Sequence, residues 1–93
     1  MIRSFASKAT KDIWDGAGSR RLPMEIQNVA RRKLRMLNNA TDIRELTVPP
    51  KNRLEKLTGD RLGQYSIRIN DQWRICFQWI DGDAYEVEVV DYH

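Results

Sequence analysis

His93 is the only histidine in the chain, and it directly follows Asp91 and Tyr92. Histidine is the side chain best suited to proton transfer near neutral pH, and the residues before it predict a β-strand that delivers it to the rim of a sheet. A single histidine at a chain end is also typical of an ordinary solvated terminus. A catalytic role for His93 therefore depends on whether other polar residues converge on the same place.

The second half of the chain alternates apolar and polar residues with the period of two that is typical of β-strands. Strands are predicted over residues 64–69, 73–79 and 85–92. The connections between them are short, and Asp81 with Gly82 is a tight-turn signal between the last two strands. Short connections of this kind indicate an antiparallel meander.

Alternation assigns the strand residues to the two faces of this sheet. If the apolar residues pack against helices, then Arg68, Arg74 and Tyr92 share the opposite, open face. An open face carries polar residues in any case, which accounts for Arg68, but Arg74 lies mid-strand in a run dominated by Trp, Ile and Phe. Glu86 and Glu88 are interpreted as solvated edge-strand charges. The predicted inward set is Ile67, Ile75, Phe77, Val87 and Val89, with Tyr85 in step with the last two.

The first half of the chain has a helical period instead. A short strand is predicted over residues 2–5 and helices over 8–15 and 23–38, the second with one apolar face. Asp42 and Glu45 resemble a capping pair for a short turn. An amphipathic helix is suited to cover the apolar face of the sheet, which indicates an α+β fold. Three arginines on the polar face of the second helix are interpreted as solvated charge or, as a weaker alternative, as a nucleic-acid or partner surface: Arg31, Arg32 and Arg35.

Length and composition limit the classes of protein to consider. Ninety-three residues predict a single domain, 1–93, with one hydrophobic core. Cys76 is the only cysteine and is interpreted as a packing residue, so no internal disulfide is expected. The absence of a long apolar run and of a signal-peptide pattern predicts a cytoplasmic protein with no membrane partner. One histidine and one cysteine argue against zinc; carboxylate-bound magnesium stays open, and neither a metal nor another cofactor is expected.

Charge is divided unevenly along the chain. Residues 1–56 hold 13 Lys or Arg against six Asp or Glu, whereas residues 57–93 hold three against seven. A basic half on a small domain is typical of a protein that binds a phosphate-rich partner. A charged, solvated helix face would produce the same excess, so charge alone leaves both interpretations open.

Four stretches of the chain are specific enough to compare with known families: Leu57–Arg61, Tyr65–Ile67, Trp73–Phe77 and Asp91–His93. Together with Ile2–Phe5 and Ala40–Asp42, they resemble the HigB-type toxins of bacterial toxin–antitoxin pairs, a branch of the RelE/ParE superfamily. The resemblance implies a RelE-like α+β fold: a twisted antiparallel sheet, mixed at the N-terminal strand, with two main helices packed on one face. It also implies an endoribonuclease that cuts messenger RNA in the ribosomal A site, in contact with ribosomal RNA, and a HigA-like helix-turn-helix antitoxin as partner.

The chemistry implied by the resemblance matches residues already named. Metal-independent RNA cleavage uses the 2′-hydroxyl as nucleophile on the adjacent phosphate, and it needs proton removal, charge stabilisation and proton donation to the leaving oxygen. The family places this function in a strand arginine and a closing triplet, which match Arg74 and Asp91, Tyr92 and His93 here. A guanidinium can bind two phosphate oxygens at once. His93 is the best proton carrier, Asp91 can orient it or share in the transfer, and Tyr92 can stack on a base or hydrogen-bond the phosphate.

Four basic residues are further candidates for RNA binding: Arg53, Lys56, Arg61 and Arg68. One departure from the resemblance concerns this group, because several relatives carry a lysine where this chain has Thr58. A threonine cannot supply that charge, and spacing does not show whether Lys56 or Arg61 replaces it. The departure predicts a slower nuclease and leaves the class unchanged.

Two other functions fit parts of the same sequence. A ParE-like toxin of the same superfamily would inhibit DNA gyrase by binding and would need no proton-transfer residues, whereas the closing triplet favours the nuclease. A nucleic-acid-binding protein without activity would need only the basic first half. Expression of the protein separates the nuclease from the ParE-like toxin, according to whether RNA or DNA metabolism fails first.

We predict that deleting His93 removes most cleavage of ribosome-bound messenger RNA with little change in melting temperature, because a terminal residue makes few packing contacts. A one-residue extension should also weaken cleavage, since it moves the α-carboxylate that favours the protonated ring. The measurements are cleavage rates and thermal melts of the three proteins. If the deletion variant cleaves as fast as the native chain, the proton-transfer roles pass to Asp91 and Tyr92.

Overall fold

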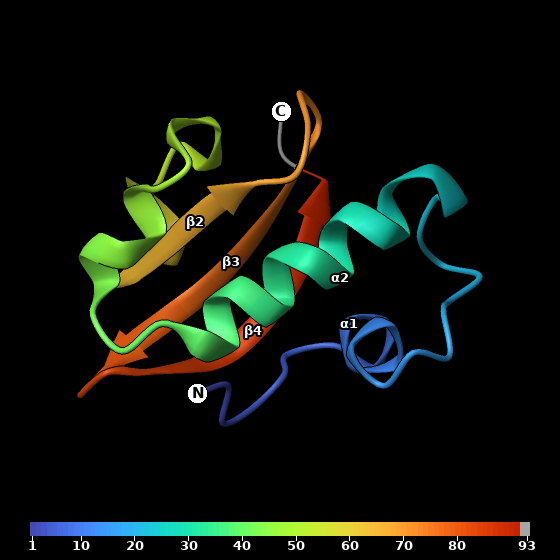
Figure 1. Ribbon diagram of the computed structural model, residues 1–93, viewed down its shortest axis with the longest axis horizontal. Helices are drawn as coiled ribbons and strands as arrows, with labels where there is room; N and C mark the ends of the chain where they lie inside the picture. Colours follow the sequence, from blue (N-terminus) through green and yellow to red (C-terminus); the bar gives the residue numbers. More distant parts are fainter. Residues whose placement is uncertain (92–93) are drawn as a thin grey trace.

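The computed structural model describes residues 1–91 and arranges them as a four-stranded sheet with two helices against one face (Figure 1). The helices are α1, Lys8–Trp14, and α2, Met24–Asn39. The strands are β1, Glu55–Lys56; β2, Gln64–Arg68; β3, Trp73–Ile80; and β4, Asp83–Asp91. They lie in the order β1-β2-β3-β4 with every neighbouring pair antiparallel. The α+β class predicted from the sequence is confirmed.

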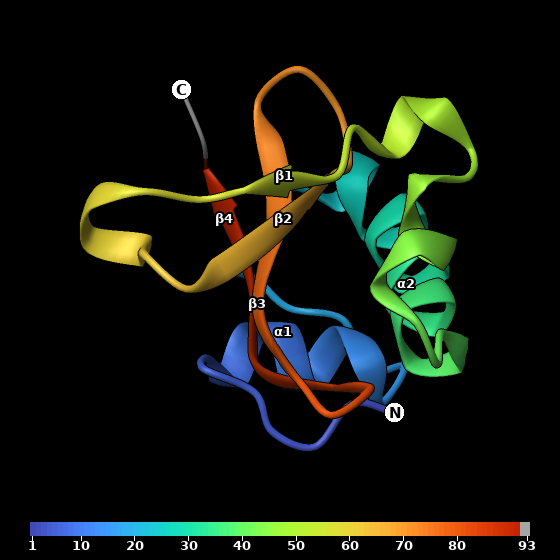
Figure 2. The same ribbon diagram turned by 90° about the vertical axis from the view of Figure 1, so that its left-hand side faces the viewer.

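Among the residues that the structure describes there are also three 3-10 helices, which all lie between α2 and β2: η1, Ile43–Thr47; η2, Pro50–Asn52; and η3, Gly59–Arg61. Figure 2 turns the sheet nearly edge-on and shows α2 on one side of it and the segment from β1 through η3 extending to the other side. The two faces of the sheet are therefore covered by different kinds of structure. Helices cover one face, and a short irregular segment approaches the other.

The helix-facing side of the sheet forms the hydrophobic core. All five residues predicted to point inward are buried, and their exposed fractions are 7% or less: Ile67, Ile75, Phe77, Val87 and Val89. They meet the apolar stripe of α2, whose buried members include Ile26, Ala30, Leu34 and Leu37. Alternation in the strands and the 3.6-residue period of α2 thus produce one continuous apolar layer.

Strand β4 departs from strict alternation at one place. Cys76 pairs with Glu88 but Gln78 pairs with Tyr85, so Glu86 and Val87 together oppose the single residue Phe77. Glu86 adopts a left-handed conformation with φ 52°, and the extra residue is a β-bulge. The bulge moves Tyr85 out of step with Val87, contrary to the sequence-based expectation, and Ala84 is the buried residue instead.

The N-terminal segment lies along the outer edge of β4. Parallel bridges join Ile2 to Ala84 and Phe5 to Val87, and the N–H of Arg3 donates to the carbonyl of Ala84 at 2.8 Å. The predicted strand over residues 2–5 is thus present as two isolated bridges, and it makes the sheet mixed at this edge as expected. At the opposite edge lies β1, in a stretch where the sequence pattern predicts no strand.

Helix α2 begins at Met24, one residue after the predicted start. Pro23 precedes the helix with ψ 137°, which is extended backbone, and so it serves as the cap residue instead of the first helical residue. On the outer face of α2, Arg31 differs from the solvated charge expected there. Its Nε donates a hydrogen bond to the carbonyl of Ile13 at 3.0 Å, which ties α2 to α1.

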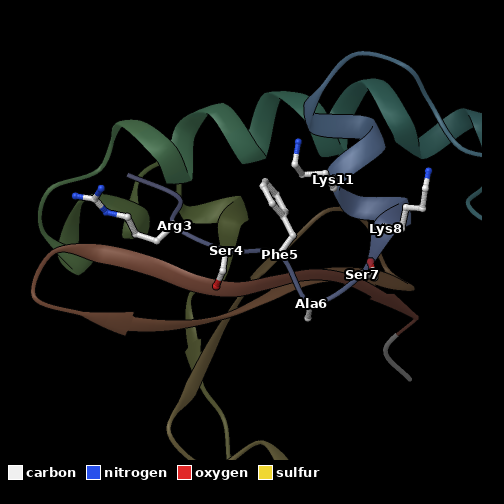
Figure 3. A pocket seen from close by; sticks show the side chains of 7 residues that line it. All are labelled: Arg3, Ser4, Phe5, Ala6, Ser7, Lys8 and Lys11. Carbon is white, nitrogen blue, oxygen red and sulfur yellow. The ribbon is translucent and has the colours of Figure 1, made fainter.

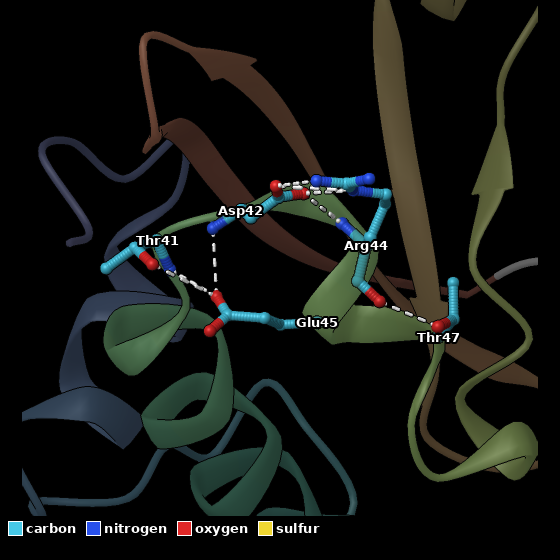
Figure 4. Close-up of polar contacts among 5 residues, drawn as sticks. All are labelled: Thr41, Asp42, Arg44, Glu45 and Thr47. Carbon is cyan, nitrogen blue, oxygen red and sulfur yellow. Dashed lines mark hydrogen bonds and ion pairs between the residues drawn. The ribbon is translucent and has the colours of Figure 1, made fainter.

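The turn η1 begins with the predicted capping pair, which Figure 4 shows in detail. The N–H of Asp42 donates to Glu45 Oε2 at 2.8 Å, and the N–H of Arg44 donates to Asp42 Oδ1 at 2.9 Å. Arg44 also places Nη2 2.7 Å from Asp42 Oδ2. This hydrogen bond from the guanidinium, followed by the one from the backbone N–H, lowers the pKa of Asp42 to about 2.

We predict that this ion pair makes stability depend on pH in the acid range. The pKa of Asp42 in the folded protein, about 2, lies below the value of about 3.9 expected for an unfolded chain. The pair therefore stabilises the fold fully above about pH 4, and this contribution is lost as the pH falls toward the folded value. Asp42→Asn keeps a capping side chain without the charge. Its melting temperature should approach that of the native protein as the pH falls from 5 to 2, and a difference that stays constant would contradict the assignment.

Candidate active site

Arg74 is the most buried charged residue at the candidate site, with 8% of its surface exposed. It pairs with Arg68 on β2 and Val90 on β4, and alternation places it on the face opposite α2. The alternation in the sequence correctly predicts that Arg74 lies on this face, but it also predicts that the face is open. At Arg74 the face is covered, because a chain segment remote in sequence folds onto the guanidinium.

Ser66, Arg53 and Glu55 all contact the Arg74 guanidinium. Its Nε donates to Ser66 Oγ at 2.8 Å, and its Nη2 donates to the carbonyl oxygen of Arg53 at 2.5 Å. Its Nη1 lies 3.6 Å from Glu55 Oε1, in an ion pair. Hydrogen bonds at two different nitrogens fix both the position and the plane of the guanidinium. The cation is therefore preorganised by the protein.

Glu55 and Ser66 are site residues that sequence reasoning missed. Glu55 belongs to a strand of only two residues, too short to show any period, and it pairs with Ser66 on the neighbouring strand. One signal was present, because Glu55 is the only carboxylate within the basic stretch 51–56. Its side chain is half exposed, so a proton acceptor is available beside the buried cation.

A second arginine reaches the same face from η3. Nη1 of Arg61 donates to Gln64 Oε1 at 3.1 Å, and its Nη2 lies 3.3 Å from Glu88 Oε1. These contacts tie η3 to β2 and β4 across the sheet. Glu88 is thus a paired carboxylate, and the expectation of a solvated edge charge is wrong for it. Cys76 lies opposite Glu88 and is fully buried, and burial raises the pKa of its thiol, in agreement with a packing role.

The other three predicted RNA-binding residues differ in where they lie relative to Arg74. Arg68 makes an ion pair with Asp71 in the turn after β2. Lys56 pairs with Tyr65 and therefore lies on the helix side of the sheet, away from Arg74. The side chain of Arg53 is exposed, whereas its backbone carbonyl contacts Arg74. The structure thus brings Arg61 and Arg68 to the face of Arg74, sets the Arg53 carbonyl against its guanidinium, and does not bring Lys56 there.

The closing triplet is described only at its first residue. Asp91 pairs with Trp73, whereas Val90 pairs with Arg74, so Asp91 is assigned to the other face of the sheet as alternation predicted. Asp91 Oδ2 accepts a hydrogen bond from Gln72 Nε2 at 3.0 Å. Tyr92 and His93, the other two predicted catalytic residues, lie outside the described residues.

A pocket of about 410 Å³ opens on the N-terminal segment and α1, away from the Arg74 cluster (Figure 3). Three cations line it, and each is engaged with a carboxylate: Arg3 with Asp83, Lys8 with Asp12 and Lys11 with Asp15. None of its lining side chains is suited to proton transfer near neutral pH. The pocket therefore offers no reaction chemistry of the kind found around Arg74.

Residues 1–91 contain neither a metal-binding cluster nor a membrane-spanning helix. Within that part of the chain, no three His, Cys, Asp or Glu side chains gather closely enough to hold a metal ion. Neither of the two helices described there has the length and apolar character needed to cross a membrane.

The fold places the protein in a known structural class. The YoeB–YefM complex from Staphylococcus aureus contains a chain that aligns with 100% of this chain and 98% of its own length, with a TM-score of 0.61 and 18% sequence identity. A heterotetrameric YoeB–YefM toxin–antitoxin complex from the same organism aligns equally well. At this level of identity the likeness defines the fold, which is that of the RelE-like toxins.

Sequence comparison then identifies the family. Residues 3–93 match the family described as "RelE-like toxin of type II toxin-antitoxin system HigB". Toxin HigB-1 of Vibrio cholerae is 42% identical over 85 residues, which cover 90% of both chains. Endoribonuclease HigB of Proteus vulgaris is 37% identical over 93 residues and covers both chains completely. The chain belongs to the HigB family of RelE-like toxins, and as a type II toxin it has an antitoxin as partner.

We predict that Ser66→Ala lowers the free energy of unfolding by about 1–3 kcal/mol, because the buried Nε–H of Arg74 then loses its acceptor. Urea unfolding measures the loss. The same substitution in an Arg74→Met background is the matched control, and there the loss should largely disappear. An equal loss with and without Arg74 would show that Ser66 stabilises the fold independently of the guanidinium.

Proposed function

We propose that this toxin is a metal-independent endoribonuclease that cleaves messenger RNA held in the ribosomal A site and thereby stops translation. The relative from Proteus vulgaris that aligns along the whole chain is named an endoribonuclease. The observation that carries the proposal is the buried guanidinium of Arg74, held by hydrogen bonds at Nε and Nη2. A cation fixed before the reaction stabilises a charged transition state without reorganisation.

The reaction requires one bond to form and one to break at phosphorus. The 2′-oxygen loses its proton to a base and bonds to the adjacent phosphate, and the bond from phosphorus to the 5′-oxygen breaks as that oxygen gains a proton. The products are a 2′,3′-cyclic phosphate and a 5′-hydroxyl. Arg74 stabilises the negative charge that accumulates on the phosphate oxygens between these two events.

Several residues are candidates for the proton transfers. Histidine is the side chain best suited to proton transfer near neutral pH, which favours His93, and Asp91 is the carboxylate predicted to orient it. Glu55 is a third candidate, because it lies 3.6 Å from the same guanidinium that would bind the phosphate. In this proposal Tyr92 stacks on a base of the RNA or donates a hydrogen bond to the phosphate.

The basic residues around this centre would hold the RNA backbone. Arg61 and Arg68 already bind carboxylates, and a phosphate can take the place of a carboxylate on a guanidinium. Arg53 lies beside Arg74, whereas Lys56, on the other side of the sheet, is proposed to contact RNA away from the reacting phosphate. Salt should weaken this binding, because it rests on contacts between cations and phosphates.

The setting of the reaction follows from the proposed substrate. Translating ribosomes place the toxin in the cytoplasm and bring ribosomal RNA into contact with the basic residues around Arg74. The antitoxin is proposed to be a HigA-like helix-turn-helix protein. Co-purification with the product of a neighbouring reading frame tests that pairing.

We predict that Arg74→Ala slows cleavage of ribosome-bound RNA by roughly 30- to 900-fold, which corresponds to about 2–4 kcal/mol of lost transition-state stabilisation. Single-turnover cleavage on ribosomes is the measurement. Arg35→Ala, which removes an exposed cation from α2, is the matched control and should cleave normally.

Because Arg74 is buried, melting temperature and circular dichroism must accompany these rates, and Arg74→Lys provides a second variant that keeps the charge. A folded Arg74→Ala protein with the native rate would overturn the proposal. Inhibition of DNA gyrase without RNA cleavage would also overturn it, in favour of a ParE-like action.

A further inference from the structure

Asn52, the last residue of η2, is a polar side chain with 0% of its surface exposed. Its Nδ2 donates hydrogen bonds to the carbonyl oxygens of Leu46 at 3.1 Å and Val48 at 3.4 Å. Nδ2 also lies 3.0 Å from Sδ of Met36. Its Oδ1 accepts a hydrogen bond from Nζ of Lys33 on α2. Both ends of this amide therefore tie the connection after α2 to the helix itself.

The segment that Asn52 anchors is the one that covers the candidate active site. Arg53 follows directly in a left-handed conformation with φ 44°, which side chains other than glycine rarely adopt and which surrounding contacts must maintain. The carbonyl of Arg53 accepts the Nη2 hydrogen bond of Arg74 at 2.5 Å. Glu55 is two residues further on and pairs with Nη1. The position of Asn52 thus sets where two of the groups around the guanidinium lie.

Replacing Asn52 alone by an apolar residue would leave the carbonyls of Leu46 and Val48 without this donor, whereas an apolar cluster could fill the same space without any polar group. Buried polar groups stabilise a fold only when all their hydrogen bonds are made, and apolar replacements of similar volume are often equally stable. Lys33 is also held unfavourably, since its pKa is lowered by burial and by the neighbouring Arg32. A hydrogen-bonded pair has one property that apolar packing lacks, which is a fixed direction. That property matters where a carbonyl must meet a guanidinium.

We propose that Lys33 and Asn52 are positioning residues of the reaction centre, which act through the Arg53 carbonyl to hold the Arg74 guanidinium in its productive orientation. This inference rests on the proposed function, because it assumes that Arg74 stabilises the transition state. With these two residues the site extends from the face of Arg74 to α2, which lies against the opposite face of the sheet. A displaced guanidinium would still attract RNA, so the loss should appear in the chemical step.

The sharpest variant is Lys33→Met, which removes the donor to Asn52 Oδ1 and keeps most of the aliphatic stem. Arg32→Met is the matched control, because it removes an exposed cation from the adjacent position of α2. Asn52→Ala removes the whole anchor and is the stronger variant. Melting temperatures of all three variants show which of them fold.

Two measurements separate positioning from simple stabilisation. At saturating ribosome-bound RNA, Lys33→Met should cleave at least about tenfold more slowly, while the half-saturating concentration stays unchanged. The Nε–H resonance of Arg74 in nuclear magnetic resonance spectra should shift in Lys33→Met and stay in place in Arg32→Met, because only the first change reaches the guanidinium. A residue that only stabilised the fold would change the melting temperature and neither of these two quantities.

The outcomes also separate this inference from the proposed function. If Arg74→Ala loses cleavage while folded Lys33→Met retains the native rate and the native Arg74 resonance, the inference is overturned and the proposed function stands. If Arg74→Ala cleaves normally, the proposed function fails first. Should Asn52→Ala fail to fold, Lys33→Met alone decides the question.

Discussion

Arg74 carries a permanent charge at a place on the sheet that water scarcely reaches, and a buried guanidinium must receive hydrogen-bond acceptors from the protein. Ser66 on β2 supplies two acceptors, its Oγ at 2.8 Å from Nε and its backbone carbonyl oxygen at 3.4 Å from Nη2. The carbonyl of Arg53 and the carboxylate of Glu55, on the edge strand β1, supply further acceptors, and both belong to the segment between α2 and β2. The path of the chain between α2 and β2 is therefore constrained by one cation.

The two faces of the sheet follow different physical rules. On the helix side, apolar area is removed from water, and the contacts between α2 and residues such as Ile75 and Phe77 need only the right volume. On the Arg74 side the described contacts are polar and directional, and the ion pair between Arg61 and Glu88 is an example. The first face stabilises the fold, and the second is the face on which a phosphate could be bound.

The sequence was sufficient to predict the elements in which apolar residues recur with a regular period. Period two marked β2, β3 and β4, the helical period marked α2, and Asp42 with Glu45 marked the start of η1. It was insufficient where the outcome depends on contacts between distant segments. The two residues of β1 show no period, the bulge at Glu86 requires the opposing strand, and the burial of Arg74 depends on Arg53, which lies 21 positions earlier. The same limit applies to the site: Arg74 was identified from its place in an apolar run, whereas Glu55 and Ser66 became visible only through their contacts.

The bridges between residues 2–5 and β4 also bear on how the protein folds during its own synthesis. Ile2 pairs with Ala84 and Phe5 with Val87, so residues 2–5 must wait for a segment that is synthesised much later before this edge of the sheet can close. Contacts of such long sequence separation form slowly and late. The sheet therefore stays incomplete until β4 has been synthesised. Until then the nascent toxin is incompletely folded while it is attached to a ribosome, the proposed site of its action.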